Sequence, residues 1–525
     1  MKLTKQEWLL LILFSTLFLA WSSLPNWAGY ALQTRELSYT GAFFDTRDYA
    51  VHIAMLRAGT DGELAYSFRF TTEPHQAYYI RMFYLALGQV NRLFHADPEL
   101  IFQIAKWIFG YLALFALFSL IKRVFASARE QWLAFSLTIL GGGLGYVQMI
   151  FGWIPGPTPP VDLWLIDPYF FFSLALFPHF AFTLALMCVA LAIYFDFLQS
   201  GGWRKIVLIV IAGWLVQAVN PIAFAVVDVA MAVATLVVWG RSGQLKLDQF
   251  AALTGIALSQ IPLLLYNFIL LNNDPIWKQF TAQNETLSPP PIYYIWGFGL
   301  FWPLAIFGSA RAWREQNPIL LACLAWIITA FALAYAPFAI QRRFLLGITI
   351  PLAFLATHAL AGIFERLSKN NLWISRRIPL LALWSVLLIS ITSLIFIPAY
   401  TLYMQARPAE YFYPRALDAA FKWMSANTGP NDFVLGVEDT GRLVAQKTGR
   451  RVYLGHVMET LNYETKVEEV TAYYRNELAS DMIKRVPIQW VIFGPYERKI
   501  APDFQPDDNL ELVYQSDGIQ IYKVK

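Results

Sequence analysis

The sequence predicts a polytopic α-helical membrane protein that carries a small soluble α/β domain at its C-terminal end. Three observations support this fold class. Of the 525 residues, 57% are hydrophobic and only 14% are charged, whereas a soluble domain usually has about a quarter charged residues. Apolar runs of about 20 residues, the length that crosses a bilayer, recur as far as residue 398. Beyond that residue the sequence becomes charged and rich in turns.

Eleven apolar runs are predicted to be membrane spans. They are Glu7–Leu24, Leu100–Ile121, Gln131–Phe151, Ala175–Leu198, Ile206–Ala223, Ala225–Trp239, Phe250–Leu271, Ile292–Ser309, Ile319–Pro337, Phe344–Phe364 and Ile378–Pro398. The start of the chain resembles a signal peptide, with Lys2 and Lys5 before an apolar stretch. No small-x-small cleavage site follows it cleanly, so we expect an uncleaved first helix.

Basic residues between the runs orient the predicted spans. Most of them, such as Lys122, Arg123 and Arg204, fall on the side of the N-terminus, which the positive-inside rule places in the cytoplasm. An odd number of spans then puts the long first loop, residues 25–98, and the C-terminal region outside. We therefore predict a transmembrane domain over residues 1–398, which includes that loop, and an extracytoplasmic α/β domain over residues 399–525.

The first loop contains two segments with helical character. The segment from Asp45 to Ala58 has the pattern of an amphipathic helix. The second, "HQAYYIRMFYLALGQVNRLF", is aromatic and apolar but is interrupted by Arg81, Gln89 and Arg92. We interpret it as a helix lying in the membrane interface. If it were a true span, the C-terminal domain would lie inside.

The C-terminal region alternates between helix and strand patterns, which is typical of a small α/β domain. A helix is predicted over "ALDAAFKWMSANT", and strands over "DFVLGV", "RRVYLG" and "IQWVIFG". A further helix is predicted over Tyr463–Lys484. The final stretch, "LELVYQSDGIQIYKV", is typical of a hairpin with Asp517-Gly518 at its turn.

Asp45, Asp48 and His52 share one face of the first predicted loop helix, because they are spaced by three, four and seven residues. A carboxylate at the boundary between water and lipid can act as a general base or help to hold a divalent cation. In the alternative interpretation the aspartates only cap the helix and favour its dipole, and His52 only holds a loop.

Glu73 and His75, in "TTEPHQAYY", are candidates for substrate binding at the end of the same loop. The alternative is an ordinary helix start with Thr72 as the cap. His179, in "FPHF" near the outer end of the fourth span, could contact a phosphate or a sugar. Alternatively, its Pro-His pair only distorts the end of the helix.

Arg342 and Arg343 lie at the outer end of a span, on the side where basic residues are otherwise rare. Arginine suits bidentate binding of a phosphate, although side chains there can also extend to lipid headgroups. Cys188 and Cys323 both lie in apolar runs and give neither a disulfide framework nor metal-ligand spacing. The net charge of only +4 makes nucleic acid an unexpected partner.

The chain resembles the integral membrane glycosyltransferases of the GT-C fold. The resemblance rests on the layout of nearly the whole chain and on "FDTRDYAVH", "EPH", "FPHF" and "QRRFLLGITIPLAFLA". The C-terminal "GRRVYLGHVMETLNY" and "VIFGPYERK" look like the external domain of bacterial relatives in the RgtA-like and mannosyltransferase-like groups.

The resemblance implies a hexosyl- or pentosyltransferase of the cytoplasmic (inner) membrane that takes a sugar from a polyprenyl-phosphate donor. It implies Asp45 or Asp48 as general base, and Arg342 or Arg343 on the lipid phosphate. The remaining substrate-binding candidates are His52, Glu73, His75 and His179. The family's acidic motif often has adjacent or once-spaced carboxylates, whereas two residues separate these aspartates. The catalytic aspartate and the need for a cation, Mg²⁺ or Mn²⁺, are therefore left open.

Two other functions compete with this one. A transporter or flippase for a lipid-linked saccharide should have polar groups near the middle of the bilayer, whereas those noted above lie at its predicted outer boundary. A non-catalytic envelope assembly protein would use its external domain to bind a partner. The sequence does not distinguish among a glycan, a lipid and a protein as the acceptor.

Overall fold

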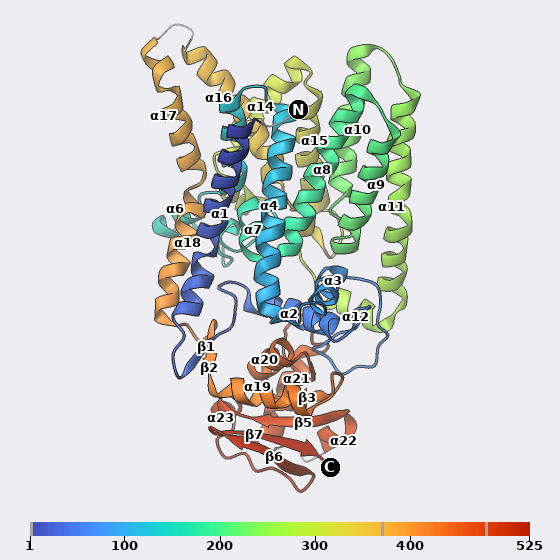
Figure 1. Ribbon diagram of the computed structural model, residues 1–525, viewed down its shortest axis with the longest axis vertical. Coiled ribbons are helices and arrows are strands. Elements are labelled where there is room, and N and C mark those ends of the chain that lie inside the picture. Colours follow the sequence, from blue (N-terminus) through green and yellow to red (C-terminus); the bar gives the residue numbers. More distant parts are fainter. Residues whose placement is uncertain (1–3, 155, 369–371, 478–480) are drawn as a thin grey trace. The chain divides into compact units, whose positions relative to one another are not determined.

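The computed structural model describes residues 4–154, 156–368, 372–477 and 481–525. The chain divides into two compact units, whose helices and strands are labelled in Figure 1. Unit 1 comprises Met1–Ser23, Ala105–Phe268 and Glu285–Ala399. Unit 2 comprises Leu24–Ile104, Ile269–Asn284 and Tyr400–Lys525. Unit 2 thus contains the whole of the predicted first loop in addition to nearly all of the C-terminal region.

Each of the eleven predicted spans coincides with a helix or with a bent pair of helices. In chain order these are α1 (Lys5–Ala31), α4 (Pro98–Val124), α5 (Ala128–Leu140) with α6 (Gly145–Phe151), α8 (Pro178–Ser200), α9 (Trp203–Val219), α10 (Ala225–Ser242), α11 (Leu247–Asn273), α13 (Pro291–Phe298) with α14 (Phe301–Glu315), α15 (Pro318–Ala334), α16 (Thr349–Ser368), and α17 (Leu372–Ile389) with α18 (Ile391–Tyr403). Three short elements also belong to unit 1: η1 (Val161–Leu163), α7 (Phe170–Leu176) and η2 (Gln341–Leu345).

The described residues contain 6 helices long and apolar enough to cross a membrane, or up to 9 if each bent pair forms one span. The predicted number of eleven therefore stays a prediction. In the most apolar 18-residue stretch of α11, only 17% is buried. Ile306 and Phe307 of α14 are 65% and 66% exposed. So much exposed apolar surface is unfavourable in water but is stable in contact with lipid. The protein is accordingly a multi-pass membrane protein.

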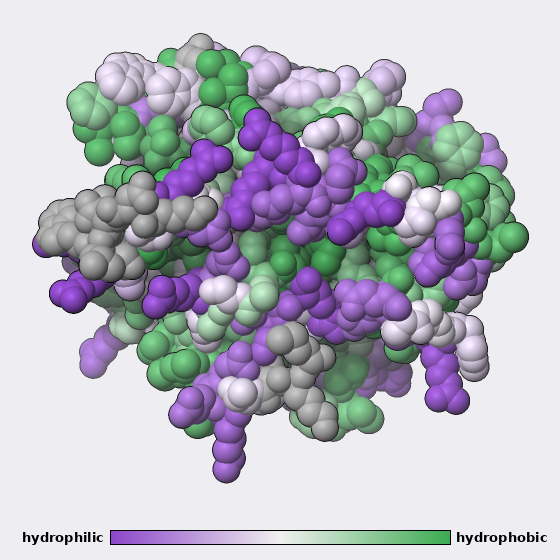
Figure 2. All heavy atoms as spheres, turned by 90° about the horizontal axis from the view of Figure 1, so that it is seen from above, coloured by the Kyte–Doolittle hydropathy of each residue, from purple (hydrophilic) through white to green (hydrophobic). Residues whose placement is uncertain are grey.

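One end of unit 1 carries the N-terminus and a set of ion pairs between helix ends. Lys122 of α4 lies 2.9 Å from Glu7 of α1, and Arg123 lies 2.5 Å from Asp196 of α8. Figure 2 shows hydrophilic side chains over the middle of this end and apolar side chains around much of its rim. Basic side chains thus lie at this end, as the sequence suggests, while the orientation of the N-terminus in the membrane stays a prediction.

The bends between α5 and α6 and between α17 and α18 meet at one buried carboxylate. The Oδ2 atom of Asp162 accepts hydrogen bonds from the backbone N–H groups of Gly143 (3.1 Å) and Gly145 (2.9 Å) and from Thr392 Oγ1 (2.7 Å). A Cβ atom on Gly143 would lie only 2.1 Å from the carbonyl oxygen of Gly297 in α13. The absence of a side chain at Gly143 thus permits close helix packing at this bend.

Two helices of unit 2, α2 (Thr46–Thr60) and α3 (Met82–Asn91), come from the predicted first loop. They pack backbone to backbone, because a Cβ atom on Gly59 would lie 2.3 Å from the carbonyl oxygen of Leu85. With 10 residues, α3 is about 15 Å long, half the thickness of a bilayer core. This segment therefore contains no spanning helix, as predicted, and its place in the interface stays a prediction.

The C-terminal region contains a five-stranded sheet in the order β4-β3-β5-β7-β6. Its strands are β3 (Phe433–Leu435), β4 (Arg451–Val452), β5 (Ile488–Phe493), β6 (Leu510–Ser516) and β7 (Ile519–Val524). Its helices are α19 (Ala416–Asn427), α20 (Glu438–Thr448), α21 (Tyr463–Tyr474), α22 (Asp481–Arg485) and α23 (Pro495–Ile500). The pairings of β3 with β4 and β5 are parallel, and those of β7 with β5 and β6 are antiparallel.

The predicted hairpin at the end of the chain is confirmed. Ser516 pairs with Ile519, and the two residues between them, Asp517 and Gly518, have φ angles of 46° and 75°. Two positive φ angles in a two-residue turn are typical of type I′, which fits the twist of the strands it joins.

Early and late parts of the chain are joined within unit 2. Strand β1 (Leu37–Tyr39) pairs antiparallel with β2 (Phe412–Pro414). Gln446 Nε2 donates to the carbonyl oxygen of Thr40 (2.6 Å), and Lys447 Nζ lies 2.5 Å from Glu99 Oε1. The short helix α12 (Pro275–Gln283) completes this unit.

Candidate functional site

The N-terminus of α2 is formed by Asp45, which is the N-cap predicted by the capping interpretation. Its Oδ1 atom accepts a hydrogen bond from the backbone N–H of Asp48 (3.2 Å). Asp45 has left-handed backbone angles, φ 47° and ψ 59°, a conformation that aspartate tolerates better than most residues. The oxygens of Asp45 thus help to fix the first turn of the helix, in which Asp48 lies.

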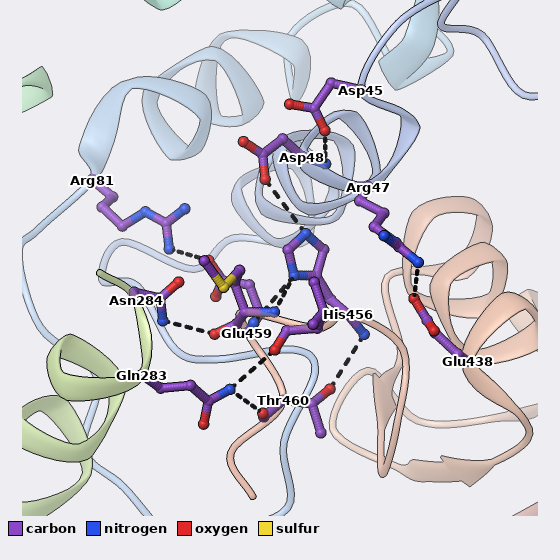
Figure 3. A network of polar contacts seen from close by, with 12 residues as sticks. Asp45, Arg47, Asp48, Arg81, Gln283, Asn284, Glu438, His456, Glu459 and Thr460 are labelled. Atoms are coloured by element: carbon purple, nitrogen blue, oxygen red, sulfur yellow. Dashed lines mark hydrogen bonds and ion pairs between the residues drawn. The ribbon is translucent and has the colours of Figure 1, made fainter. Parts of the chain in front are cut away.

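Asp48 faces a histidine to which no local sequence pattern assigns a role. Its side chain is 44% exposed, and its Oδ1 atom lies 3.4 Å from Nε2 of His456, which is 2% exposed. Figure 3 shows the imidazole directed at the carboxylate from the loop that follows β4. The carboxylate therefore has a buried polar group behind it while part of its surface remains open to solvent.

The hydrogen bonds of His456 define the state of its ring. The Nδ1 atom accepts from the backbone N–H groups of Met458 (3.0 Å) and Glu459 (3.1 Å). A ring nitrogen that accepts hydrogen bonds carries no proton, so in the neutral ring the proton is on Nε2. The group directed at Asp48 is therefore an N–H donor.

The loop over residues 455–461 that carries His456 is held from several sides (Figure 3). Thr460 Oγ1 accepts from the N–H groups of residues 455 and 456. Gln283 Nε2 donates to the carbonyl oxygens of residues 457 and 460, and Asn284 Nδ2 donates to that of residue 458. These bonds fix the position of the imidazole.

The same loop also holds a cation near Asp48 through its residue Glu459. Arg81, at the start of α3, lies 2.6 Å from Glu459, whose other oxygen accepts from Tyr66 Oη (2.8 Å). Burial by itself would lower the pKa of Arg81, but the negative charges of Glu459 and, more weakly, Asp48 raise it. Arg81 is 30% exposed, so a cation lies within electrostatic reach of Asp48.

His52, predicted to share the face of the aspartates, is buried in the packing of two helices. Its ring stacks on Tyr84 of α3, with ring centroids 4.2 Å apart and planes 18° from parallel. This contact favours a structural role in holding α2 against α3.

Glu73 and His75 bind their own chain. Glu73 pairs with Lys466 at 2.8 Å and accepts a hydrogen bond from Thr71. Burial acts to raise the pKa of Glu73, but Lys466 and Thr71 hold it below its usual value. His75 Nε2 accepts from the N–H of Phe68 (2.9 Å), and Nδ1 donates to the carbonyl oxygen of Glu73 (2.7 Å). Burial lowers the pKa of His75, which suits this neutral ring.

These contacts support structural roles for both residues, and their predicted role in substrate binding stays a prediction. The helix start that was the alternative for this segment is absent, because the next helix, α3, begins only at Met82.

The other three predicted site residues lie in unit 1. His179 is the second residue of α8, directly after Pro178 at N1, and its ring packs against Phe180 with centroids 4.1 Å apart. Arg342 and Arg343 lie in η2, and the guanidinium of Arg342 lies over the ring of Trp164 at 5.1 Å. Proline at N1 and a cation over an indole face are both stable arrangements in their own right.

Arg343 is paired with a buried acid. Its Nη1 atom lies 3.3 Å from Oδ1 of Asp167, which is 5% exposed, while Arg343 itself is 37% exposed. The pairing fixes one edge of the guanidinium. A guanidinium presents five N–H donors, more than the contact with Asp167 uses.

Within the described parts of the chain, no group of three or more His, Cys, Asp or Glu side chains is arranged to hold a metal ion. His456 is not suited to join Asp45 and Asp48 as a ligand, because its Nδ1 lone pair is engaged and Nε2 carries a proton. Two carboxylates with water can still hold Mg²⁺. A cation at Asp45 and Asp48 therefore stays a prediction.

No protein-family model matches the chain, and no curated protein matches its sequence. Solved structures do match. ArnT from Cupriavidus metallidurans bound to undecaprenyl phosphate has 11% identity and a TM-score of 0.52, over 99% of this chain and 98% of ArnT. The apo oligosaccharyltransferase of Archaeoglobus fulgidus has 13% identity and a TM-score of 0.54, over 92% of this chain and 69% of that enzyme.

A third match is the arabinofuranosyltransferase AftD from mycobacteria, with 14% identity and a TM-score of 0.52, over 100% of this chain but 42% of AftD. All three are glycosyltransferases with the GT-C fold. At such low identities the likeness concerns the fold alone. The chain therefore has the GT-C fold, as the resemblance in its sequence predicted.

Proposed function

We propose that this protein is a membrane glycosyltransferase that moves a sugar from a polyprenyl-phosphate donor to an acceptor at the extracytoplasmic face of the cytoplasmic membrane. The GT-C fold supports this proposal. Among the structures that share the fold, one is bound to undecaprenyl phosphate and another is tethered to an acceptor peptide. The sugar would be a hexose or a pentose, and the acceptor a glycan, a lipid or a protein.

The observation that carries the proposal is the environment of Asp48: a half-exposed carboxylate in the first loop with a buried imidazole behind it. We assign Asp48 the role of general base. A hydroxyl of the acceptor would lose its proton to the carboxylate as its oxygen attacks the anomeric carbon. The bond from that carbon to the phosphate oxygen would break, and the lipid phosphate would leave with the electron pair.

We assign Asp45 a supporting role. Its carboxylate caps α2 and binds the backbone N–H of Asp48, so it positions the first turn of the helix. Asp45→Asn keeps an oxygen that can cap the helix, whereas Asp48→Asn removes the base. The two variants should therefore differ in activity.

We assign the lipid phosphate to an arginine of η2, either Arg342 or Arg343, with His179 in support. A lipid phosphate is already a good leaving group, so the protein has to orient the acceptor and neutralise the developing charge. A guanidinium suits this task, because it binds phosphate bidentately. In Arg343, the contact with the buried Asp167 would hold the guanidinium in position for this task.

The proposal includes an arrangement in the membrane. The N-terminus would be cytoplasmic, residues 1–398 would form the transmembrane domain with its external loop, and residues 399–525 would form an extracytoplasmic domain. The basic side chains at the end of unit 1 that carries the N-terminus support this orientation.

The experiment that tests the proposal uses the whole chain in proteoliposomes. Undecaprenyl phosphate carrying a radiolabelled hexose or pentose is supplied as the donor, and extracted cell-envelope glycans and lipids are supplied as acceptors. We expect a new glycosidic bond with the unmodified protein and a loss of roughly 10²- to 10⁴-fold with Asp48→Asn. Asp45→Asn should keep most of the activity.

Three results would contradict the proposal. Movement of labelled donor across the membrane without a new glycosidic bond would identify a transporter or flippase instead. Full activity in the double variant Asp45→Asn, Asp48→Asn would exclude the carboxylates from catalysis. An absence of both transfer and transport with every sugar would favour the non-catalytic assembly protein.

A further inference from the structure

We propose that His456 is a positioning residue for Asp48: its Nε2–H group holds the carboxylate in the orientation in which it accepts the proton of the acceptor. The inference rests on the proposed function and deepens it, because it adds a residue from the C-terminal region to the general base that the first loop supplies. Three features of His456 carry it.

The first feature is where the side chain points. His456 is 2% exposed, and its Nε2 atom has no hydrogen-bond partner among the described residues. Leaving a buried donor without a partner is unfavourable. The polar atom it faces is Asp48 Oδ1, at 3.4 Å. A small movement of the half-exposed carboxylate would close this distance to a hydrogen bond.

The second feature is that the imidazole ring is held in one tautomer and one orientation. The N–H groups of Met458 and Glu459 both point at Nδ1. A proton on Nδ1 would bring donor against donor, and a flipped ring would bring Cδ2–H against the same two N–H groups. The backbone of the loop therefore keeps the N–H group of the neutral ring directed at Asp48.

The third feature is the anchoring of the loop. Its backbone is bound by side chains from α12 and the residue after it, Gln283 and Asn284, and the N–H of residue 461 donates to Thr71 Oγ1 (3.3 Å). The same loop holds Arg81 through Glu459. Such multiple support is expected where a side chain must stay within a few tenths of an ångström of its working position.

Two substitutions test the roles of the two ring nitrogens of His456 separately. In His456→Asn, the amide oxygen can take the place of Nδ1 and accept from the loop N–H groups, so the loop is kept and the contact with Asp48 is lost. In His456→Gln, the amide nitrogen can take the place of Nε2 and donate to Asp48. A purely structural histidine would be replaced better by asparagine, and a positioning histidine better by glutamine.

The measurement is the transfer rate of the full-length protein in proteoliposomes at varied donor concentration. We expect His456→Asn to lower kcat by roughly 10- to 100-fold, with an unchanged KM for the donor and an unchanged thermal unfolding temperature. His456→Gln should recover most of kcat. Full kcat in His456→Asn, or an equal loss in both variants, would overturn the proposal.

A second readout separates this proposal from the proposed function. The chain has six histidines, so selective ¹⁵N-histidine labelling gives a spectrum in which the signals absent from His456→Asn belong to His456. We expect an unprotonated Nδ1 and a protonated Nε2, and a shift of the Nε2 signal in Asp48→Asn. If no sugar is transferred but this pattern is seen, the proposed function fails while the contact stands. A protonated Nδ1, or no response to Asp48→Asn, would overturn the inference itself.

Discussion

Asp162 in unit 1 and Asp48 in unit 2 bind their surroundings in opposite ways. Asp162 is 2% exposed, and one of its oxygens receives three hydrogen bonds from two bends of the helices. Asp48 is 44% exposed and faces one buried N–H group. The first carboxylate serves the fold, because its capacity to accept is directed at its own chain. The second keeps accessible surface on which a substrate hydroxyl could bind.

The largest effect expected from this comparison is on catalysis. Asp48→Asn should lower the transfer rate by roughly 10³-fold, about 4 kcal/mol, and leave the unfolding temperature unchanged. Asp162→Asn keeps an oxygen for the glycine N–H groups and should leave transfer within a few fold of the unmodified protein. Transfer assays and thermal unfolding of both variants check this. If Asp162→Asn were the less active of the two, the assignment of roles would be reversed.

Glu73 sharpens the comparison, because it is a predicted site residue with the environment of a structural one. Glu73→Gln leaves the buried Lys466 without its partner, which should destabilise unit 2 by roughly 3 kcal/mol. Since the pKa of Glu73 is lowered in the folded state, its contribution to stability is present above the unfolded pKa of about 4.3 and is lost as the pH falls below it.

Denaturation of the detergent-solubilised protein measures this loss. The double variant Glu73→Leu, Lys466→Met is the control and should be more stable than Glu73→Gln. A stable Glu73→Gln variant whose KM for a substrate has risen would return Glu73 to the binding site.

Arg343 and Asp167 form an intermediate case, because one partner is buried and the other is more than a third exposed. If Arg343 binds the donor phosphate, Arg343→Gln should raise the KM for the donor by roughly 10- to 100-fold, the value of one charge-assisted hydrogen bond. Asp167→Asn should leave this KM nearly unchanged. Equal effects of the two variants on KM would show that the pair acts only as a structural unit.

The smallest effect concerns pH. Burial raises the pKa of Asp162 to about 6 against the hydrogen bonds that lower it. The folded protein therefore binds a proton more readily than the unfolded chain, and stability increases as the pH falls through 6. Between pH 7 and pH 5 the gain should be about 1 kcal/mol. Thermal unfolding at the two pH values should show it, and Asp162→Asn should remove it.

Much of the fold follows from local patterns. Long apolar runs predict the helices of unit 1, and Asp517-Gly518 predicts the final turn. The bends within the paired helices cannot be predicted in this way, because hydropathy averaged over about 20 residues does not reveal a break of a few residues. The turn at Gly141–Gly145 depends on a carboxylate and a hydroxyl from two other parts of the chain, Asp162 and Thr392.

The site divides in the same way. Asp45 and Asp48 are recognisable from the sequence, because helical spacing and capping act over a few residues. His456 and Arg81 were not assigned roles, because their partners are distant: Arg81 and Glu459 are 378 residues apart in the chain. The only local hint at His456 is that it follows Gly455 in a loop between a predicted strand and a predicted helix.

The pairing of β1 with β2 has a consequence for biosynthesis. The first loop leaves the ribosome early. Its strand β1 and its Asp48, however, can meet their partners only after residues 412–414 and 455–461 have been made. At roughly 5–20 residues per second, that delay is on the order of half a minute. In the proposed orientation, α2 and α3 would be exported during this interval without their contacts to the C-terminal region, so a chaperone that shields them would increase the yield of assembled protein.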